Sequence, residues 1–141
     1  MREVAMTENS AQSPRELVEQ LYHLLTSPSV DVFVSHLAPD VVFEIPFAVP
    51  DLPERMQGRE AVREHLATRW SRMHEIRIHG VYPTIHATTD PEVFVVENEI
   101  DATRGGERSR NRTSVAVLRI RDGKVVEFRD YMNTARYVRA S

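Results

Sequence analysis

The chain has 141 residues, of which 41% are hydrophobic and 28% charged, and its formal net charge at pH 7 is -3. It contains no cysteine, which excludes disulfides, thiol nucleophiles and cysteine-ligated zinc or iron–sulfur centres. Its arginines are scattered among acidic residues and form no basic stripe, so nucleic acid is not expected as a partner.

Residues 1–12 lack the apolar core of a signal peptide. We interpret them as a disordered tail, and residues 13–141 as a single domain. No apolar run in the sequence approaches the roughly 18 residues that cross a membrane. We therefore expect a soluble, cytoplasmic protein that has no membrane partner.

Three helices are predicted in the first half of the chain. In the first, Ser13, Pro14 and Glu16 form a capping box with proline in the first turn, and Ser27-Pro28 ends the helix. Its apolar stripe consists of Leu17, Val18, Leu21, Leu24 and Leu25, with Tyr22 at the edge. The second helix is expected over residues 31–37 and the third over 59–73.

Strands follow from alternating apolar residues. The first is predicted over 41–47, and one of its faces consists of Val41, Phe43, Ile45 and Phe47. Residues 48–57 are expected to form a loop that covers a pocket. Four further strands are predicted over 76–88, 93–102, 112–121 and 124–132. Asp122-Gly123 marks a hairpin between the last two, and Asn133 is expected to cap a final helical turn with Ala135, Tyr137 and Val138.

This order of elements predicts an α+β fold. Strands joined by hairpins form a curved, mostly antiparallel sheet, and the helices of the first half pack on one of its faces. A twisted sheet wrapped around three helices leaves an apolar hollow, which is where such folds bind small ligands.

Three segments resemble a known family: 37–44 (LAPDVVFE), 58–65 (GREAVREH) and 122–131 (DGKVVEFRDY). They are similar to segments of the SnoaL-like group, in the superfamily of nuclear transport factor 2 and ketosteroid isomerase, and the likeness covers about residues 13–139. The resemblance implies a cone-shaped α+β barrel with a ligand pocket between helices and sheet. It also implies a homodimer formed through the outer face of the sheet.

Within that group, residues 89–97 and 129–133 resemble the phenazine-biosynthesis A/B-type proteins. This resemblance implies that His65 of the third helix and Asp130 of the last strand act on a bound small molecule. The chain departs from the pattern at two positions. Its acid is one methylene shorter than the glutamate of those proteins, and Arg69 replaces a serine one turn after the histidine.

Fewer of the site residues of the steroid isomerases have a counterpart in this sequence. Those enzymes use a carboxylate base in the first strand and a protonated carboxylic acid in a later strand. The matching positions here are Ile45 and Ala116, neither of which can transfer a proton. Tyr22 alone has a counterpart, so we exclude a dienolate mechanism run by that residue set.

Asp130 is the leading candidate for chemistry on the residues alone. The last strand places Val126, Phe128, Asp130 and Met132 on one face, and Val125, Glu127, Arg129 and Tyr131 on the other. If the first face is inward, the carboxylate enters an apolar pocket, its pKa rises, and it suits a general acid or base. The alternatives are that Asp130 caps the final helical turn or pairs with a buried arginine.

His65 lies at the margin of the third helix's apolar face, and we expect it to transfer protons together with Asp130. Alternatively, it is a half-buried histidine with ordinary hydrogen bonds. Arg69, one turn later, is a candidate anchor for an anionic ligand group, or else a surface residue. The six histidines show no metal-binding spacing, so neither a metal site nor a cofactor is expected.

Further residues are candidates for ligand contact. They are Tyr22, Phe43, Ile45, Trp70, Ala116 and Phe128. The hydroxyl of Tyr22 can donate a hydrogen bond, although a core tyrosine is the alternative. Glu97 is also a candidate, but the alternation of Glu97, Glu99 and Asp101 is typical of a solvated strand face. That face is expected to pair with Arg108, Arg110 and Arg112.

Taken together, these residues predict a small-molecule-binding protein with a pocket for an apolar or aromatic metabolite of secondary metabolism. We expect a cofactor-independent acid–base enzyme of the cyclase, isomerase, condensation or dehydration type. Two alternatives stay open. One is a ligand-binding or accessory subunit without catalysis, and the other is a structural dimer with a vestigial pocket.

Overall fold

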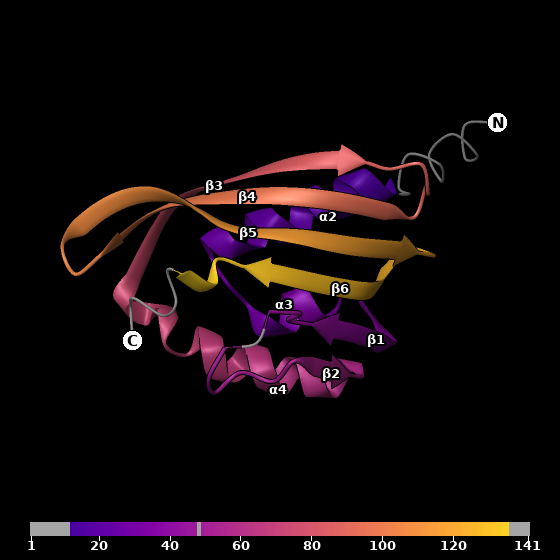
Figure 1. Ribbon diagram of the computed structural model, residues 1–141, viewed down its shortest axis with the longest axis horizontal. Coiled ribbons are helices and arrows are strands. Elements are labelled where there is room, and N and C mark those ends of the chain that lie inside the picture. Colours follow the sequence, from indigo (N-terminus) through magenta and orange to yellow (C-terminus); the bar gives the residue numbers. More distant parts are fainter. Residues whose placement is uncertain (1–11, 48, 136–141) are drawn as a thin grey trace, which may run out of the picture.

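The computed structural model describes residues 12–47 and 49–135 (Figure 1). Its helical elements are α2 (Pro14–His23), η1 (Leu24–Thr26), α3 (Val30–Val34), α4 (Arg59–Trp70) and η2 (Met73–Glu75). Its strands are β1 (Leu37–Glu44), β2 (Arg55–Gln57), β3 (Ile76–Ala87), β4 (Val93–Arg104), β5 (Glu107–Arg121) and β6 (Lys124–Met132). Residues 1–11 of the predicted tail, and Tyr137 and Val138 of the predicted final turn, lie outside the described residues.

The capping box predicted for the first helix is present. The Ser13 hydroxyl accepts a hydrogen bond from the Glu16 amide at 3.1 Å, and the Ser13 amide donates to the Glu16 carboxylate at 2.9 Å. The amphipathic stripe of α2 buries Leu17, Val18, Leu21 and Tyr22. Tyr22 is only 5% exposed, so it belongs to the buried face rather than to its edge.

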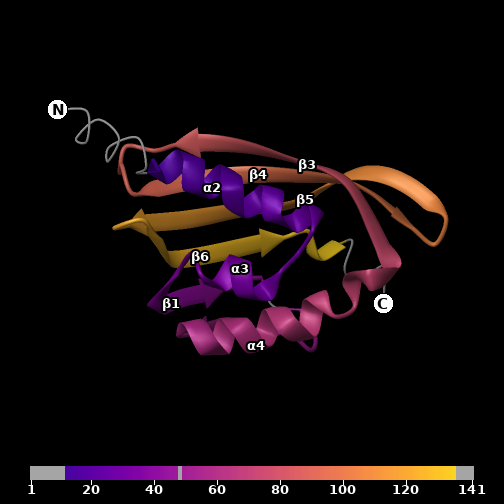
Figure 2. The same ribbon diagram turned by 180° about the vertical axis from the view of Figure 1, so that it is seen from behind.

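The six strands form one curved sheet in the order β2-β1-β6-β5-β4-β3. Within residues 12–47 and 49–135, four of the five strand pairs are antiparallel, and only β1 and β6 run parallel. Figure 2 shows α2 and α3 in front of the sheet, with α4 alongside β1. The predicted α+β fold is therefore confirmed, and the core lies between these helices and the inner face of the sheet.

The first strand differs from its prediction at both ends. It begins at Leu37 because the His36 carbonyl accepts a hydrogen bond from the Val125 amide, and it ends at Glu44. Phe47, predicted to share the inward face, is 58% exposed and packs edge-on against Tyr131 at 5.3 Å. The predicted covering loop also contains a short strand, β2, which pairs with the end of β1.

A bulge in β6 decides which of its residues face inward. Arg119 pairs with Glu127 and Ile120 with Val125, which leaves Val126 as an extra residue. Val125 is therefore fully buried, contrary to the alternation predicted for it and for Val126. Beyond the bulge the predicted alternation holds, and Phe128 is buried.

The hairpin turns and the outer face agree with the sequence. Asp122 and Gly123 have positive φ values of 51° and 75°, as a two-residue hairpin turn requires. On the outer face, Arg108 pairs with Asp101 at 2.8 Å, and Arg110 and Arg112 both reach Glu99. Among the described residues, none of the helices has the length and apolar character needed to cross a membrane.

Candidate functional site

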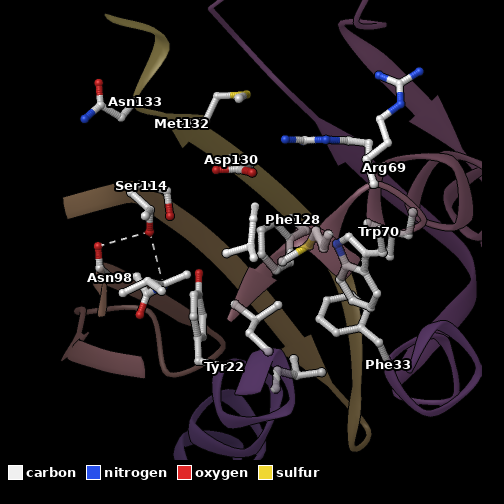
Figure 3. A pocket seen from close by; sticks show the side chains of 18 of the residues that line it. Tyr22, Phe33, Arg69, Trp70, Asn98, Ser114, Phe128, Asp130, Met132 and Asn133 are labelled. Carbon is white, nitrogen blue, oxygen red and sulfur yellow. Dashed lines mark hydrogen bonds between the residues drawn. The ribbon is translucent and has the colours of Figure 1, made fainter. Parts of the chain in front are cut away.

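A pocket of about 620 Å³ lies between the helices and the inner face of the sheet (Figure 3). Its apolar lining includes Leu21, Leu25, Phe33, Phe43, Leu66, Trp70, Ile100, Phe128 and Met132. Its polar lining consists of Tyr22, Asn98, Thr113, Ser114, Asp130 and Asn133, together with Arg69, Arg72 and Arg104. The interior predicted to be hollow is therefore not filled by side chains.

Aromatic rings form a continuous wall of this pocket. Phe43 and Phe128 stack with their centroids 4.8 Å apart and their planes 10° from parallel. Phe33 meets Trp70 edge-on at 5.4 Å and also contacts Phe128. Such a surface suits a flat apolar or aromatic ligand, because rings bury large apolar areas with little loss of side-chain freedom.

Asp130 enters this pocket from β6, as the alternation beyond the bulge places it. In Figure 3 it lies on β6 between Phe128 and Met132, with Arg69 and Trp70 across the pocket. Its Oδ1 atom is buried and has no hydrogen-bond partner among the described residues. Burial raises the pKa of Asp130 from 3.8 to about 6, and the nearby charge of Arg69 opposes part of that rise. The carboxyl group is therefore poised to exchange protons near neutral pH.

Tyr22 presents a second buried polar atom without a partner. Its hydroxyl oxygen contacts no hydrogen-bonding group among the residues that the structure describes. Burial, with a smaller effect from the charge of Asp130, raises the pKa of Tyr22 above its ordinary value. The phenol consequently keeps its proton and is available to donate a hydrogen bond to a ligand oxygen.

Asn98 is a pocket residue for which the sequence suggested no role. It is 1% exposed, because a bulge at Thr113 leaves Asn98 opposite Ser114 on the inner face. Its Nδ2 donates to the Thr113 hydroxyl at 3.3 Å, and that hydroxyl donates to the Asn98 carbonyl. Its Oδ1 has no partner among the described residues. A polar residue on a strand face that is otherwise apolar was the sequence signal for this position.

Three residues that line the pocket, Tyr22, Asn98 and Asp130, therefore each have one buried polar atom without a hydrogen-bond partner among the described residues. A buried polar group without a partner costs about 1–3 kcal/mol. A ligand carbonyl that accepts from the Tyr22 hydroxyl, and a ligand hydroxyl or N–H that donates to the Asn98 and Asp130 oxygens, would offset that cost on binding. The arrangement is chemically suited to hold a carbonyl and to move a proton beside it.

His65, predicted to act with Asp130, is not in the pocket lining. Its ring packs beside Phe43, with centroids 6.2 Å apart, and Phe43 itself forms part of the wall. Its Nε2 is buried without a partner among the described residues. Burial, and then the charge of Arg69, lower the pKa of His65 below its ordinary value. His65 is therefore neutral at physiological pH.

The remaining candidates divide between the pocket and other places. Arg69, Trp70, Phe43 and Phe128 line the pocket together with Tyr22 and Asp130. Ile45 and Ala116 are buried in the core, outside the lining. Glu97 lies on the outer face of β4 and is 2.8 Å from His86. The described residues contain no cluster of three or more histidine and acidic side chains able to hold a metal ion.

Comparison with known proteins gives one family. The family model described as the SnoaL-like domain matches residues 18–128. An uncharacterized PhzA/B-like protein of Pseudomonas aeruginosa is 26% identical over 129 residues, which cover 89% of this chain and 88% of that protein.

Two solved structures are similar in fold. A candidate isomerase from Bacillus subtilis has a TM-score of 0.72 at 21% identity, over 85% of this chain and 86% of its own. A candidate polyketide cyclase from Pseudomonas putida has a TM-score of 0.70 at 18% identity, over 92% and 98%. At these identities, the likeness concerns the arrangement of helices and strands.

Proposed function

Because this chain belongs to the SnoaL-like domain family, we propose that it binds an apolar or aromatic metabolite bearing a carbonyl group and acts on it by acid–base chemistry. The observation that carries the proposal is Asp130, a carboxyl group with a raised pKa and an unpartnered oxygen in a largely apolar pocket. The steps require only side chains that exchange protons, so they call on no cofactor.

In the proposed reaction, Asp130 is the general base. Its carboxylate accepts a proton from the carbon next to the ligand carbonyl, and the electrons of the broken C–H bond form an enolate. Tyr22 donates a hydrogen bond to the enolate oxygen, which stabilises the developing charge. Asp130 then returns the proton to the ligand. If the ligand has a double bond conjugated with the enolate, return of the proton to the far carbon of that bond gives isomerisation. Cyclisation or condensation follows if the enolate carbon first attacks a second carbonyl, whose oxygen then takes the proton.

His65 has a lesser part in this proposal than Asp130. Since Phe43 stands in the wall and His65 packs beside it, proton transfer from His65 to a ligand requires the Phe43 ring to turn aside. Arg69 connects the two residues electrostatically, because its charge lowers the pKa of both. Trp70 and Phe128 are proposed as ligand-contacting walls.

Proton exchange of an aromatic ketone in D₂O tests the proposal. With 2-tetralone as the probe, NMR follows the replacement of hydrogen next to the carbonyl, and the wild type is expected to accelerate it. The Asp130→Asn variant is expected to bind 2-tetralone but to exchange it about 100-fold more slowly. Equal exchange rates for the two proteins would refute Asp130 as the base.

Binding without catalysis is the second candidate function. It is favoured by Ile45 and Ala116, which place apolar side chains where steroid isomerases carry their acids. This function predicts that 2-tetralone binds to the wild type without any acceleration of exchange. The same experiment therefore separates the two candidates.

We also propose that two copies associate through the outer face of the sheet. Val95, Val115 and Val117 are half-buried neighbours there, since Val95 pairs with Val117 and Glu97 with Val115. Sedimentation of the wild type is expected to give a dimer, and Val117→Asp a monomer. A monomeric wild type would refute this assembly. A cytoplasmic location and a role in secondary metabolism stay predictions from the sequence.

A further inference from the structure

Three arginines gather at one end of the pocket. Arg69 is in the last turn of α4, Arg72 follows that helix, and Arg104 ends β4; all three line the pocket. Two chain segments bring them together, because η2 leads directly into β3 and Ile76, the first residue of β3, pairs with Arg104. Arg69 is half-buried, whereas Arg72 and Arg104 are exposed.

The side chains of these three arginines make no ion pair or hydrogen bond with another described residue. Several arginines on the sheet are paired, as Arg108 is with Asp101 and Arg121 with Glu92. None of the three therefore has an ion-pair partner among the residues that the structure describes, although the charge of Arg69 acts on Asp130 within the pocket.

The charge of the pocket is opposite to that of the chain. The whole chain has a formal charge of -3, but among the described residues the lining contains three arginines and a single acid, Asp130. Because the pKa of that acid is raised to about 6, half or more of its charge is absent in mildly acidic solution. The favourable effect of a cation near a helix C-terminus accounts for Arg69 and Arg72, but not for Arg104, which comes from a strand.

We propose that the ligand carries an acidic group, a carboxylate or a phosphate, and that Arg69, Arg72 and Arg104 bind this group while the aromatic wall holds the apolar body. The inference rests on the proposed function, because it concerns the substrate class of the same pocket. Guanidinium groups bind carboxylate and phosphate oxygens through paired N–H donors. The acidic group of the ligand is therefore fixed at the arginine end of the pocket.

Matched probes test the charge requirement. The probes are 2-naphthoate, 2-naphthyl phosphate and the uncharged 2-naphthamide. Trp70 is the only tryptophan of the chain and lines the pocket, so its single indole N–H signal reports binding in NMR titrations. At low salt, at least one acidic probe is expected to bind about tenfold or more tightly than 2-naphthamide. Whichever of 2-naphthoate and 2-naphthyl phosphate binds more tightly identifies the acidic group as a carboxylate or a phosphate. The difference in affinity between that acid and 2-naphthamide should become smaller at about 0.5 M salt.

Single variants then assign the effect to the arginines. Arg69→Gln, Arg72→Gln and Arg104→Gln are each expected to weaken binding of the preferred acid but not of 2-naphthamide. Arg77→Gln is the matched control, because Arg77 is an exposed residue on β3 outside the pocket lining. If 2-naphthamide binds as tightly as both acids, the inference of an acidic ligand group is wrong, but the proposal that the pocket binds aromatic ligands is retained. If none of the three probes shifts the Trp70 signal, the proposed function is refuted together with the inference.

Discussion

Ala116 on β5 lies directly opposite Asp130 on β6 in the antiparallel pair. Ala116 is fully buried, and its methyl group can neither donate nor accept a hydrogen bond. This neighbour leaves the Oδ1 of Asp130 without a partner from β5, which accords with the raised pKa of the carboxyl. Position 116 is therefore apolar, and the acid of this strand pair lies on β6.

The first prediction concerns the pH dependence of proton exchange. A general base acts in its ionised form, so the exchange of 2-tetralone by the wild type should rise with pH and level off above the Asp130 pKa of about 6. NMR exchange rates, measured across that range with the Asp130→Asn rate subtracted at each pH, check the profile. A rate that falls as pH rises through this value would assign Asp130 the role of an acid instead.

The second prediction concerns folding stability. The folded pKa of Asp130 is raised from 3.8 to about 6, so the folded state binds this proton more tightly than the unfolded chain. The ionised carboxylate therefore destabilises the fold above about pH 6, by at most about 3 kcal/mol, and the effect vanishes below about pH 4. Asp130→Asn should be more stable than the wild type at neutral pH, by about 1–2 kcal/mol since the amide is also polar.

Denaturant unfolding of both proteins at neutral and at acidic pH measures this difference. The advantage of Asp130→Asn should shrink as the pH falls. An advantage that stays constant with pH would show that it arises from packing rather than from the charge of the carboxylate.

The sequence predicted features that depend on neighbouring residues, and it did not predict features that depend on contacts between distant segments. The hairpin at Asp122-Gly123 and the inward orientation of Asp130 follow from local turn chemistry and alternation, and both were predictable. The bulge at Val126 and the parallel pairing of β1 with β6 depend on register between segments far apart in the chain. A single sequence does not encode that register in any short pattern.

The candidate site shows the same division. Alternation placed Asp130, Phe43 and Phe128 on inner faces, and they line the pocket. His65 lies at the edge of a narrow helical stripe, where the position of Phe43 on another element decides whether it reaches the pocket. Arg104 was not predicted from the sequence as a pocket residue, because β4 extends two residues beyond its predicted end.

The third prediction uses the Ala116–Asp130 pair. Side chains directly opposite each other on neighbouring strands have Cβ atoms about 5 Å apart, so Ala116→Ser brings a hydroxyl within reach of the Asp130 carboxylate. A hydrogen bond donated to the ionised carboxylate lowers its pKa. The carboxyl ¹³C signal of Asp130, titrated in both proteins, should show a lower pKa in the serine variant. Ala116→Val, which adds no donor, is the control, and an unchanged pKa in the serine variant would contradict the prediction.

The fourth prediction concerns Tyr22. Its hydroxyl is buried without a partner among the described residues, so Tyr22→Phe removes an unsatisfied group and should leave stability unchanged or raise it by up to about 1 kcal/mol. The same variant removes the proposed donor to the enolate and should slow 2-tetralone exchange by about 100-fold. Unfolding and exchange are measured on the same sample. Loss of stability with exchange retained would mean that Tyr22 is a packing residue only.

The last prediction compares His65 with Asp130. His65 lies outside the pocket lining and packs beside Phe43, which is part of that lining, so His65→Gln should slow 2-tetralone exchange far less than Asp130→Asn does. Because the neutral imidazole has no hydrogen-bond partner for its Nε2 among the described residues, a neutral glutamine should also be tolerated in the fold. Exchange rates and unfolding curves of the two variants, recorded at the same pH, give the comparison. Equal losses of exchange, with both variants folded, would mean that the Phe43 ring turns aside during the reaction and that His65 transfers a proton directly.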